Sequence, residues 1–269
     1  MKSMRCEKIA ASANCIARWC ALRSTERLAP NMADLFVLFG GGVIGSVDVL
    51  ADAMRQGVAR KYAIVGGRGH ATYWLDYAMQ SELARWGTDV TEASLPGIAS
   101  EAEMMQAVLW HRYGLRVDFL ETKSTNCGNN ITYLMDLLEA SGEVPARMVL
   151  AQDATMQRRM DVTWKRQAHD RKAFSHTQVI DWALWEVSLV ARDNTLQYEH
   201  APEGMWPIDV YLGLLVGEVD RLTDNEQGYG PRGRDFVVHV DVPNDVQQAH
   251  ALLQTYLGTN VRPPDERYA

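Results

Sequence analysis

The fold class of this chain follows from one stretch of its sequence, Leu35-Phe36-Val37-Leu38-Phe39-Gly40-Gly41-Gly42-Val43-Ile44-Gly45. Its five consecutive apolar residues, ended by glycines, are typical of a strand that is buried on both faces. A second apolar run, Tyr62-Ala63-Ile64-Val65, leads into Gly66-Gly67-Arg68-Gly69-His70. Strands of this kind belong to parallel sheets covered by helices. We therefore expect an α/β fold.

Strand and helix patterns alternate along the chain through residue 165. We expect further strands at 117–121 and 148–151, and helices at 46–59, 72–86, 100–113 and 131–140 and after Thr155. Such alternation is the pattern of βαβ units. The expected fold is a Rossmann-like parallel sheet flanked by helices, with an added C-terminal α/β or helical elaboration. We divide the chain into an N-terminal helical segment (1–30), a Rossmann-like core (31–170) and a C-terminal elaboration packed on the core (171–269).

Several element ends also have local signals. Ser100 and Glu103 fit a capping box, and Ser46 and Thr155 are the expected N-caps of their helices. In the C-terminal part we expect a strand and a helix within 174–190, a helix over 206–222, a strand over 236–242 and a final helix over 244–257.

Composition limits the partners. The sequence has 269 residues, with 27 Lys and Arg against 34 Asp and Glu, which gives a formal net charge of −7. Nucleic-acid-binding proteins usually carry a basic surface, and anionic membranes attract basic segments. We therefore expect a small-molecule ligand rather than nucleic acid or a membrane. The oligomeric state is not predicted.

The cysteines and the first residues bear on the compartment. Four cysteines without zinc-ligand or disulfide spacing indicate reduced cytoplasmic thiols. Polar residues interrupt the apolar stretch near the N-terminus, and no run of about 18 apolar residues occurs. We expect a cytoplasmic protein whose residues 8–23 form an amphipathic helix. A start at Met32 is the competing interpretation.

The glycine-rich strand ends are the first candidate ligand site. Gly40–Gly45 satisfies the G-x-G-x-x-G pattern between a strand and a helix, where backbone amides and the helix N-terminus attract anions. A dinucleotide site also needs an acidic residue after the second strand, and this chain has Gly66-Gly67-Arg68 there. Binding of another anionic group and a purely structural turn both stay open.

Polar residues at the other strand ends extend this candidate site. Arg68 is a candidate partner for an anion, and His70 is a candidate general acid or base. Glu101 is either a helix-dipole partner or an acceptor for a ligand hydroxyl, and Glu101 with Asp153 is a conceivable cation site. The structural alternative for each is a cap or a solvated surface residue.

Two further segments follow the later strands. The run Ser124–Asn130 exceeds what a helix cap needs, and Cys127 lies where a thiol pKa can fall. Arg158 and Arg159 occupy the unfavourable end of a helix dipole, which indicates contact with an anion; the alternative is a solvated helix face. The loop 228–235, with Tyr229, Arg232 and Arg234, is either a lid or an ordered surface loop.

These segments together resemble the SanA/YdcF-like family, a bacterial domain family of largely unassigned function, and most closely its cytosolic YdcF branch. The residues that carry the resemblance are Ala33-Asp34 to Gly40, Gly66–His70, Glu101, Ser124–Asn130, Gln152–Arg159 and Gly228–Phe236. It covers about residues 33–242. The resemblance implies a Rossmann-like sheet and an adenosine-type ligand, with S-adenosylmethionine proposed for the YdcF branch. Relatives often have a histidine where this chain has Gln152-Asp153-Ala154-Thr155.

We predict a binder of a small nucleotide-type ligand, with S-adenosylmethionine as the candidate cofactor and no metal. The alternatives are a hydrolase or phosphoryl-transfer enzyme on a phosphorylated metabolite, and a non-catalytic ligand sensor. The candidate catalytic residues are His70 and Asp153. The candidate binding residues are Gly40, Gly41, Gly42, Gly66, Gly67, Arg68, Gly69, Glu101, Ser124, Thr125, Asn126, Asn129, Gln152, Thr155 and Arg158. Loops 40–45, 66–70 and 124–130 are expected to meet at one rim.

Overall fold

The computed structural model describes residues 2–86 and 96–258, and in these residues five parallel strands form one sheet in the order β3-β2-β1-β4-β5. The strands are β1 (Ala33–Phe39), β2 (Ala59–Val65), β3 (Phe119–Glu121), β4 (Arg147–Gln152) and β5 (Gln178–Ala183). This confirms the Rossmann-like α/β class. The order in which the chain adds strands reverses between β1 and β4, since β2 and β3 lie on one side of β1 and β4 and β5 on the other; open α/β sheets bind ligands at such a point.

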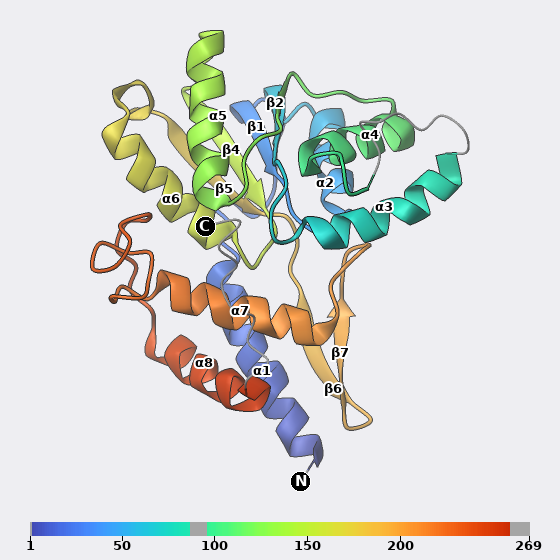
Figure 1. Ribbon diagram of the computed structural model, residues 1–269, viewed down its shortest axis with the longest axis vertical. Helices are drawn as coiled ribbons and strands as arrows, with labels where there is room; N and C mark the ends of the chain where they lie inside the picture. The colour runs from blue at the N-terminus through green and yellow to red at the C-terminus, as the bar shows by residue number, and fades with distance from the viewer. Residues whose placement is uncertain (1, 87–95, 259–269) are drawn as a thin grey trace.

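Helices cover both faces of the sheet (Figure 1). They are α2 (Ser46–Arg55), α3 (Thr72–Trp86), α4 (Glu101–Tyr113), α5 (Cys127–Ser141) and α6 (Gln157–Asp170). Along β1, Phe36 and Leu38 share a core with α2 and α4, whereas Leu35, Val37 and Phe39 share a core with α5 and α6. Successive strand residues point to opposite faces, so a continuous apolar run is what a doubly covered strand requires.

Of the helix N-caps predicted from sequence, one is confirmed and two are wrong. The capping box of Ser100 and Glu103 is present, and Gly114 ends α4 in the left-handed conformation. The expected caps Ser46 and Thr155 are wrong. Gly45 precedes α2 without a side-chain cap, and Ser46 lies inside the helix. The Thr155 hydroxyl donates to the buried Asp153 carboxylate, and Met156 precedes α6 without a side-chain cap.

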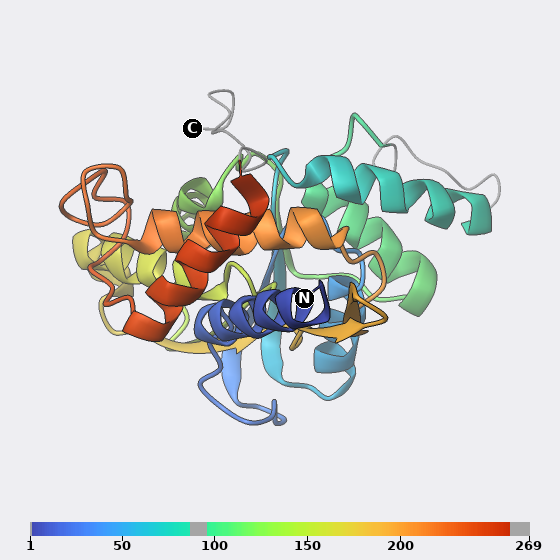
Figure 2. The ribbon, with the colours of Figure 1, turned by 90° about the horizontal axis from the view of Figure 1, so that it is seen from below.

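A second layer lies below the carboxyl edge of the sheet (Figure 1). It contains α1 (Lys2–Cys20), the hairpin of β6 (Ser188–Arg192) and β7 (Thr195–His200), α7 (Ile208–Leu222) and α8 (Asn244–Leu257). One apolar core joins α1, α7 and α8, and Figure 2 shows the three helices lying close together. The N-terminal helix therefore packs with the C-terminal elaboration, far away in sequence.

Two expectations for the C-terminal part are wrong. Residues 174–190 contribute β5 and the start of β6, and the described chain has no helix there beyond the single turn Lys172–Phe174. Residues 236–242 form no strand in the structure, since Val237 and Val238 are held by turns and by α6. Because β5 pairs with β4, the sheet continues past residue 170. The last residues of the elaboration, 259–269, lie outside the described residues.

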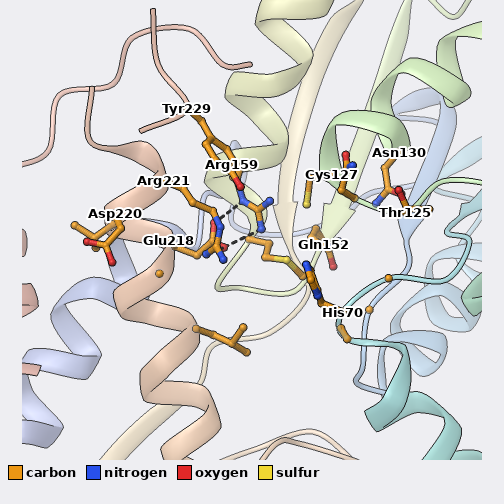
Figure 3. Close-up of a pocket in the computed structure, with 18 of the residues that line it drawn as sticks. His70, Thr125, Cys127, Asn130, Gln152, Arg159, Glu218, Asp220, Arg221 and Tyr229 are labelled. Atoms are coloured by element: carbon orange, nitrogen blue, oxygen red, sulfur yellow. Dashed lines mark hydrogen bonds and ion pairs between the residues drawn. The ribbon is translucent and has the colours of Figure 1, made fainter. Parts of the chain in front are cut away.

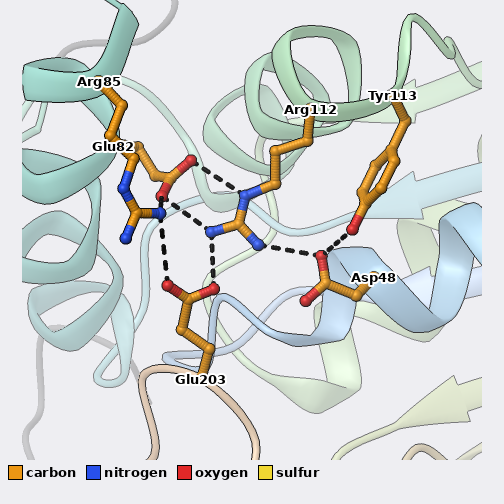
Figure 4. Close-up of polar contacts among 6 residues, drawn as sticks. All are labelled: Asp48, Glu82, Arg85, Arg112, Tyr113 and Glu203. Carbon is orange, nitrogen blue, oxygen red and sulfur yellow. Dashed lines mark hydrogen bonds and ion pairs between the residues drawn. The ribbon is translucent and has the colours of Figure 1, made fainter.

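A cluster of charged side chains fastens the two layers together (Figure 4). The Arg112 cluster consists of Asp48, Glu82, Arg85, Arg112, Tyr113 and Glu203. Arg112 donates to Glu82 from α3, to Asp48 from α2 and to Glu203, which precedes α7. It thereby fixes the segment that leads into α7 against the core. Among the described residues no helix is both long and apolar enough to cross a membrane.

Candidate functional site

A cavity of about 890 Å³ lies between the carboxyl edge of the sheet and helices α7 and α8. One wall comes from the loops after β1, β2, β3 and β4, and the other from α6, α7, α8 and the segment 223–234. Of the predicted site residues, those that line it are Gly40, Gly41, Gly67, Gly69, His70, Glu101, Ser124, Thr125, Asn126 and Gln152. The cavity thus occupies the place where an open α/β sheet binds its ligand.

The strand-end loops meet at one edge, as predicted. The Gly67 amide donates to Ser124 Oγ at 3.1 Å, and the Gln152 side-chain amide donates to the Gly40 carbonyl at 3.0 Å. The second contact joins the loop after β1 to the end of β4, across the point where the strand order reverses. Segments that are 112 residues apart in the chain are therefore held in one rim.

Most of the rim glycines are needed for packing within the chain. A Cβ atom on Gly42 would lie 2.7 Å from Trp206 Nε1 and 2.9 Å from the Ala71 carbonyl oxygen. A Cβ on Gly40 would collide with the Glu101 carboxylate. On Gly41, by contrast, the nearest atom would be 3.7 Å away. Gly42 and Gly66 do not line the cavity, so the glycine pattern reflects close packing of the loops more than a cradle for phosphate.

Glu101 is a buried acid at the end of β2. Thr72 Oγ1 donates to its Oε1 atom at 2.5 Å, and among the described residues Oε2 has no hydrogen-bond partner. Burial raises the pKa of Glu101 to about 7. The acidic residue that the sequence lacks directly after the second strand is supplied here by the first residue of α4.

The predicted pair of catalytic residues is not brought together at the surface of the cavity. His70 lines it, beside Gln152 in Figure 3. Asp153 does not line it: Oδ1 accepts from the Thr155 amide and hydroxyl, and Oδ2 is buried without a partner in the described chain. Burial raises the pKa of Asp153 to about 6.

Four other predicted binding residues have partners inside the protein and do not line the cavity. Arg68 pairs with Asp76, and Arg158 donates to the Trp19 carbonyl and lies over the Trp19 ring. The Asn129 side chain accepts from Thr125 and Asn126, and Thr155 donates to Asp153. Their proposed contact with a ligand has no support in the structure.

The wall opposite the glycines carries a buried ion cluster. The Arg159 cluster consists of Arg159, Glu218 and Arg221, all of which line the cavity (Figure 3). Arg159 donates to Glu218 through Nε at 2.6 Å and through Nη2 at 2.8 Å, and Arg221 donates to the same carboxylate at 3.2 Å. Burial opposes the charge on Arg159, but Glu218 raises its pKa above the ordinary value.

The first turn of α5 faces this cluster. Asn126 is its N-cap and accepts from the Asn129 amide. Asn130 lines the cavity and is only 8% exposed, yet the described residues provide no partner for its side-chain amide. Burial raises the pKa of the neighbouring Cys127 thiol, which opposes a nucleophilic role for this cysteine.

Sequence reasoning missed several residues of this wall, although some signals were available. Glu218 lies in the apolar run Leu214-Leu215-Val216-Gly217-Glu218-Val219, where a carboxylate must find a buried partner. Of the two arginines at the start of α6, Arg159 lines the cavity and Arg158 does not. The apolar part of the wall, from Trp74, Met156, Trp206, Val210 and Leu214, looked like ordinary core in the sequence.

No model of a known protein family matches the chain. Within residues 2–86 and 96–258, no group of three or more His, Cys, Asp or Glu side chains is arranged to hold a metal ion. Glu101 lines the cavity and Asp153 does not, so the two carboxylates are not brought together at the cavity surface.

Proposed function

We propose that the chain binds a small nucleotide-type ligand in this cavity, in the cytoplasm. The observation that carries the proposal is Glu101, a buried carboxylate at the end of β2 with one oxygen unpartnered at the cavity. In Rossmann-like folds an acid at this place accepts hydrogen bonds from ribose hydroxyls. The aromatic and apolar surface of Trp74, Trp206 and Val210 supplies a wall for a ring.

S-adenosylmethionine is the candidate cofactor for this site. Glu101 would accept from its ribose hydroxyls. When bound, the cofactor supplies a methyl group for transfer. The assignment also agrees with the resemblance to the SanA/YdcF-like family, which stays a prediction.

A second candidate function is the hydrolysis or transfer of a phosphoryl group. It is favoured by the presence of His70 and Glu101 in one cavity, since a carboxyl group with a pKa of about 7 can exchange a proton near neutral pH. Turnover of a phosphate ester would favour this candidate. Binding without turnover of any tested compound would favour a ligand sensor.

The test is to titrate the protein with adenosine, AMP and S-adenosylmethionine and to measure the affinity by calorimetry and the change in melting temperature. In Glu101→Gln we expect affinity for adenosine to fall about tenfold, because a charged acceptor for two hydroxyls is lost. The matched control is Glu103→Gln, in the same helical turn but outside the cavity, where glutamine can keep the capping box. It should stay within about twofold of the wild type.

The pH dependence adds an independent check. Glu101 must be ionised to accept two hydroxyls, so adenosine should bind more tightly as pH rises from 6 to 8, and Glu101→Gln should remove this dependence. If adenosine and its derivatives give no binding, or if both glutamine variants bind equally well, the nucleotide-type ligand is excluded at this site.

A further inference from the structure

We infer that the Arg159 side of the cavity is a subsite for a phosphate group, the terminal phosphate of a phosphomonoester. This deepens the proposed function by assigning the charged end of the ligand, and it rests on that function only for the remainder of the molecule. The subsite is formed by the Arg159 cluster on α6 and α7 and by the first turn of α5.

The charges of the Arg159 cluster do not balance. Two guanidinium groups share the single carboxylate of Glu218, which is almost fully buried, so the cluster carries one excess positive charge. The nearby acid Asp220 has a different partner, since its Oδ1 atom lies 2.8 Å from His250 Nε2. An anion in the cavity would neutralise the excess charge in surroundings where water screens it poorly.

Arg159 also has hydrogen-bonding capacity to spare. Its Nε and Nη2 atoms are engaged by Glu218, whereas among the described residues Nη1 has no partner. The bidentate contact fixes the plane of the guanidinium and holds the remaining donor at the cavity (Figure 3). The ion pair therefore positions Arg159 as well as neutralising part of its charge.

The start of α5 supplies donors from a second direction. The N-terminal turn of this 15-residue helix attracts anions through its dipole and its amide groups. The independent observation is Asn130, a side chain that is 8% exposed, lines the cavity and is unpartnered in the described part of the chain. This side-chain amide is therefore available to donate a hydrogen bond to a ligand in the cavity.

The spread of these donors selects the chemical class. Guanidinium groups come from α6 and α7, an amide comes from α5, and Tyr229 and Arg234 of the 223–234 segment also line the cavity. A phosphate group offers three peripheral oxygens in a tetrahedral arrangement, whereas a carboxylate offers two in a plane. Donors that approach from separate helices suit the tetrahedral group better.

The experiment uses the full chain and inorganic phosphate as the probe, at constant ionic strength adjusted with sodium chloride. Asn130→Asp puts a negative charge into the subsite with little change in shape, and we expect phosphate affinity to fall at least about tenfold. The control Asn244→Asp makes the same charge change at the exposed start of α8, outside the cavity, and should leave the affinity within about twofold.

Each outcome decides the inference. Loss of phosphate binding in Asn130→Asp alone supports it, as does a higher affinity for AMP than for adenosine in the wild type that this variant abolishes. Equal affinities of both variants for phosphate, or acetate binding as tightly as phosphate, would overturn it. If phosphate binds and adenosine does not, the subsite stands and the nucleotide-type ligand fails. If adenosine binds and phosphate does not, the reverse holds.

Discussion

The Arg112 cluster and the Arg159 cluster have opposite balances of charge and donors. In the Arg112 cluster, three carboxylates surround two guanidiniums, and every nitrogen of the Arg112 guanidinium donates to a carboxylate (Figure 4). In the Arg159 cluster, two guanidiniums share one carboxylate, and a nitrogen of Arg159 is left over at the cavity. A saturated arginine holds elements together, whereas an arginine with a spare donor facing a cavity is available to a ligand.

The largest effect should come from breaking the saturated cluster. Arg112→Met leaves the buried Glu82 with Arg85 as its remaining partner, which should lower the free energy of unfolding by about 3–5 kcal/mol. Urea denaturation measures the loss, and affinity for inorganic phosphate should not change. The control Arg116→Met removes an exposed arginine that lies over Trp110 and should cost under about 1 kcal/mol. A stable Arg112→Met protein would show that the cluster does not join the layers.

The second-largest effect on stability is expected at Glu101, which belongs to neither cluster. Because burial raises its pKa from 4.5 to about 7, the folded protein binds a proton more tightly than the unfolded chain. This acid therefore costs nothing below pH 4.5, destabilises increasingly between pH 4.5 and 7, and costs most above pH 7. Glu101→Gln should be more stable than the wild type at pH 8, by up to about 3 kcal/mol. Thermal unfolding at several pH values measures this difference, and an advantage that does not grow with pH would contradict it.

A smaller change tests the unsaturated cluster directly. Glu218→Gln keeps the shape of the side chain but removes the charge shared by Arg159 and Arg221, which should cost about 2 kcal/mol of stability. Both guanidiniums would then be available to an anion, so affinity for inorganic phosphate should rise severalfold. Calorimetry and urea denaturation on the same sample give the two values. A variant that loses stability and phosphate affinity together would mean that Glu218 matters mainly for positioning.

The smallest effect is expected at the rim of the saturated cluster. Glu203 contacts both Arg85 and Arg112, but its side chain is 46% exposed, so solvent screens the interaction. Glu203→Gln should therefore lower the free energy of unfolding by less than about 1 kcal/mol and leave phosphate binding unchanged. A loss comparable to that of Arg112→Met would show that the segment before α7 depends on this one contact.

The core of the fold could be predicted because its signals are local. Continuous apolar runs in β1, β2 and β4, together with Ser100, Gly114 and Gly142 at helix ends, reflect backbone and burial rules that act over a few residues. The expectations failed where tertiary contacts decide. Residues 236–242 are apolar enough for a strand, yet Val237, Val238 and Val240 pack against Val162 of α6, and the segment forms no strand in the described chain.

The candidate site divides in the same way. Its sheet-edge wall was accessible from sequence, because carboxyl ends of parallel strands meet at one edge. The opposite wall was not, because Glu218 and Arg221 are distant in sequence from Arg159 and belong to a helix whose placement no local pattern predicts. Which of Arg158 and Arg159 lines the cavity likewise depends on how α6 is rotated about its axis. That rotation is fixed by the contacts of the two arginines with Trp19 and Glu218.

Hydrophobic periodicity and turn residues act locally, so they were enough to predict the class of the fold and the edge of the sheet at which a ligand would meet the chain. Which groups remain available at that edge depends on the three-dimensional packing. Most of the glycines are taken up by close packing, Asp153 is enclosed, and Arg159 and Asn130 retain donors. The physical reason is that neighbours in three dimensions decide whether a donor or acceptor has a partner within the protein, and those neighbours come from remote parts of the chain.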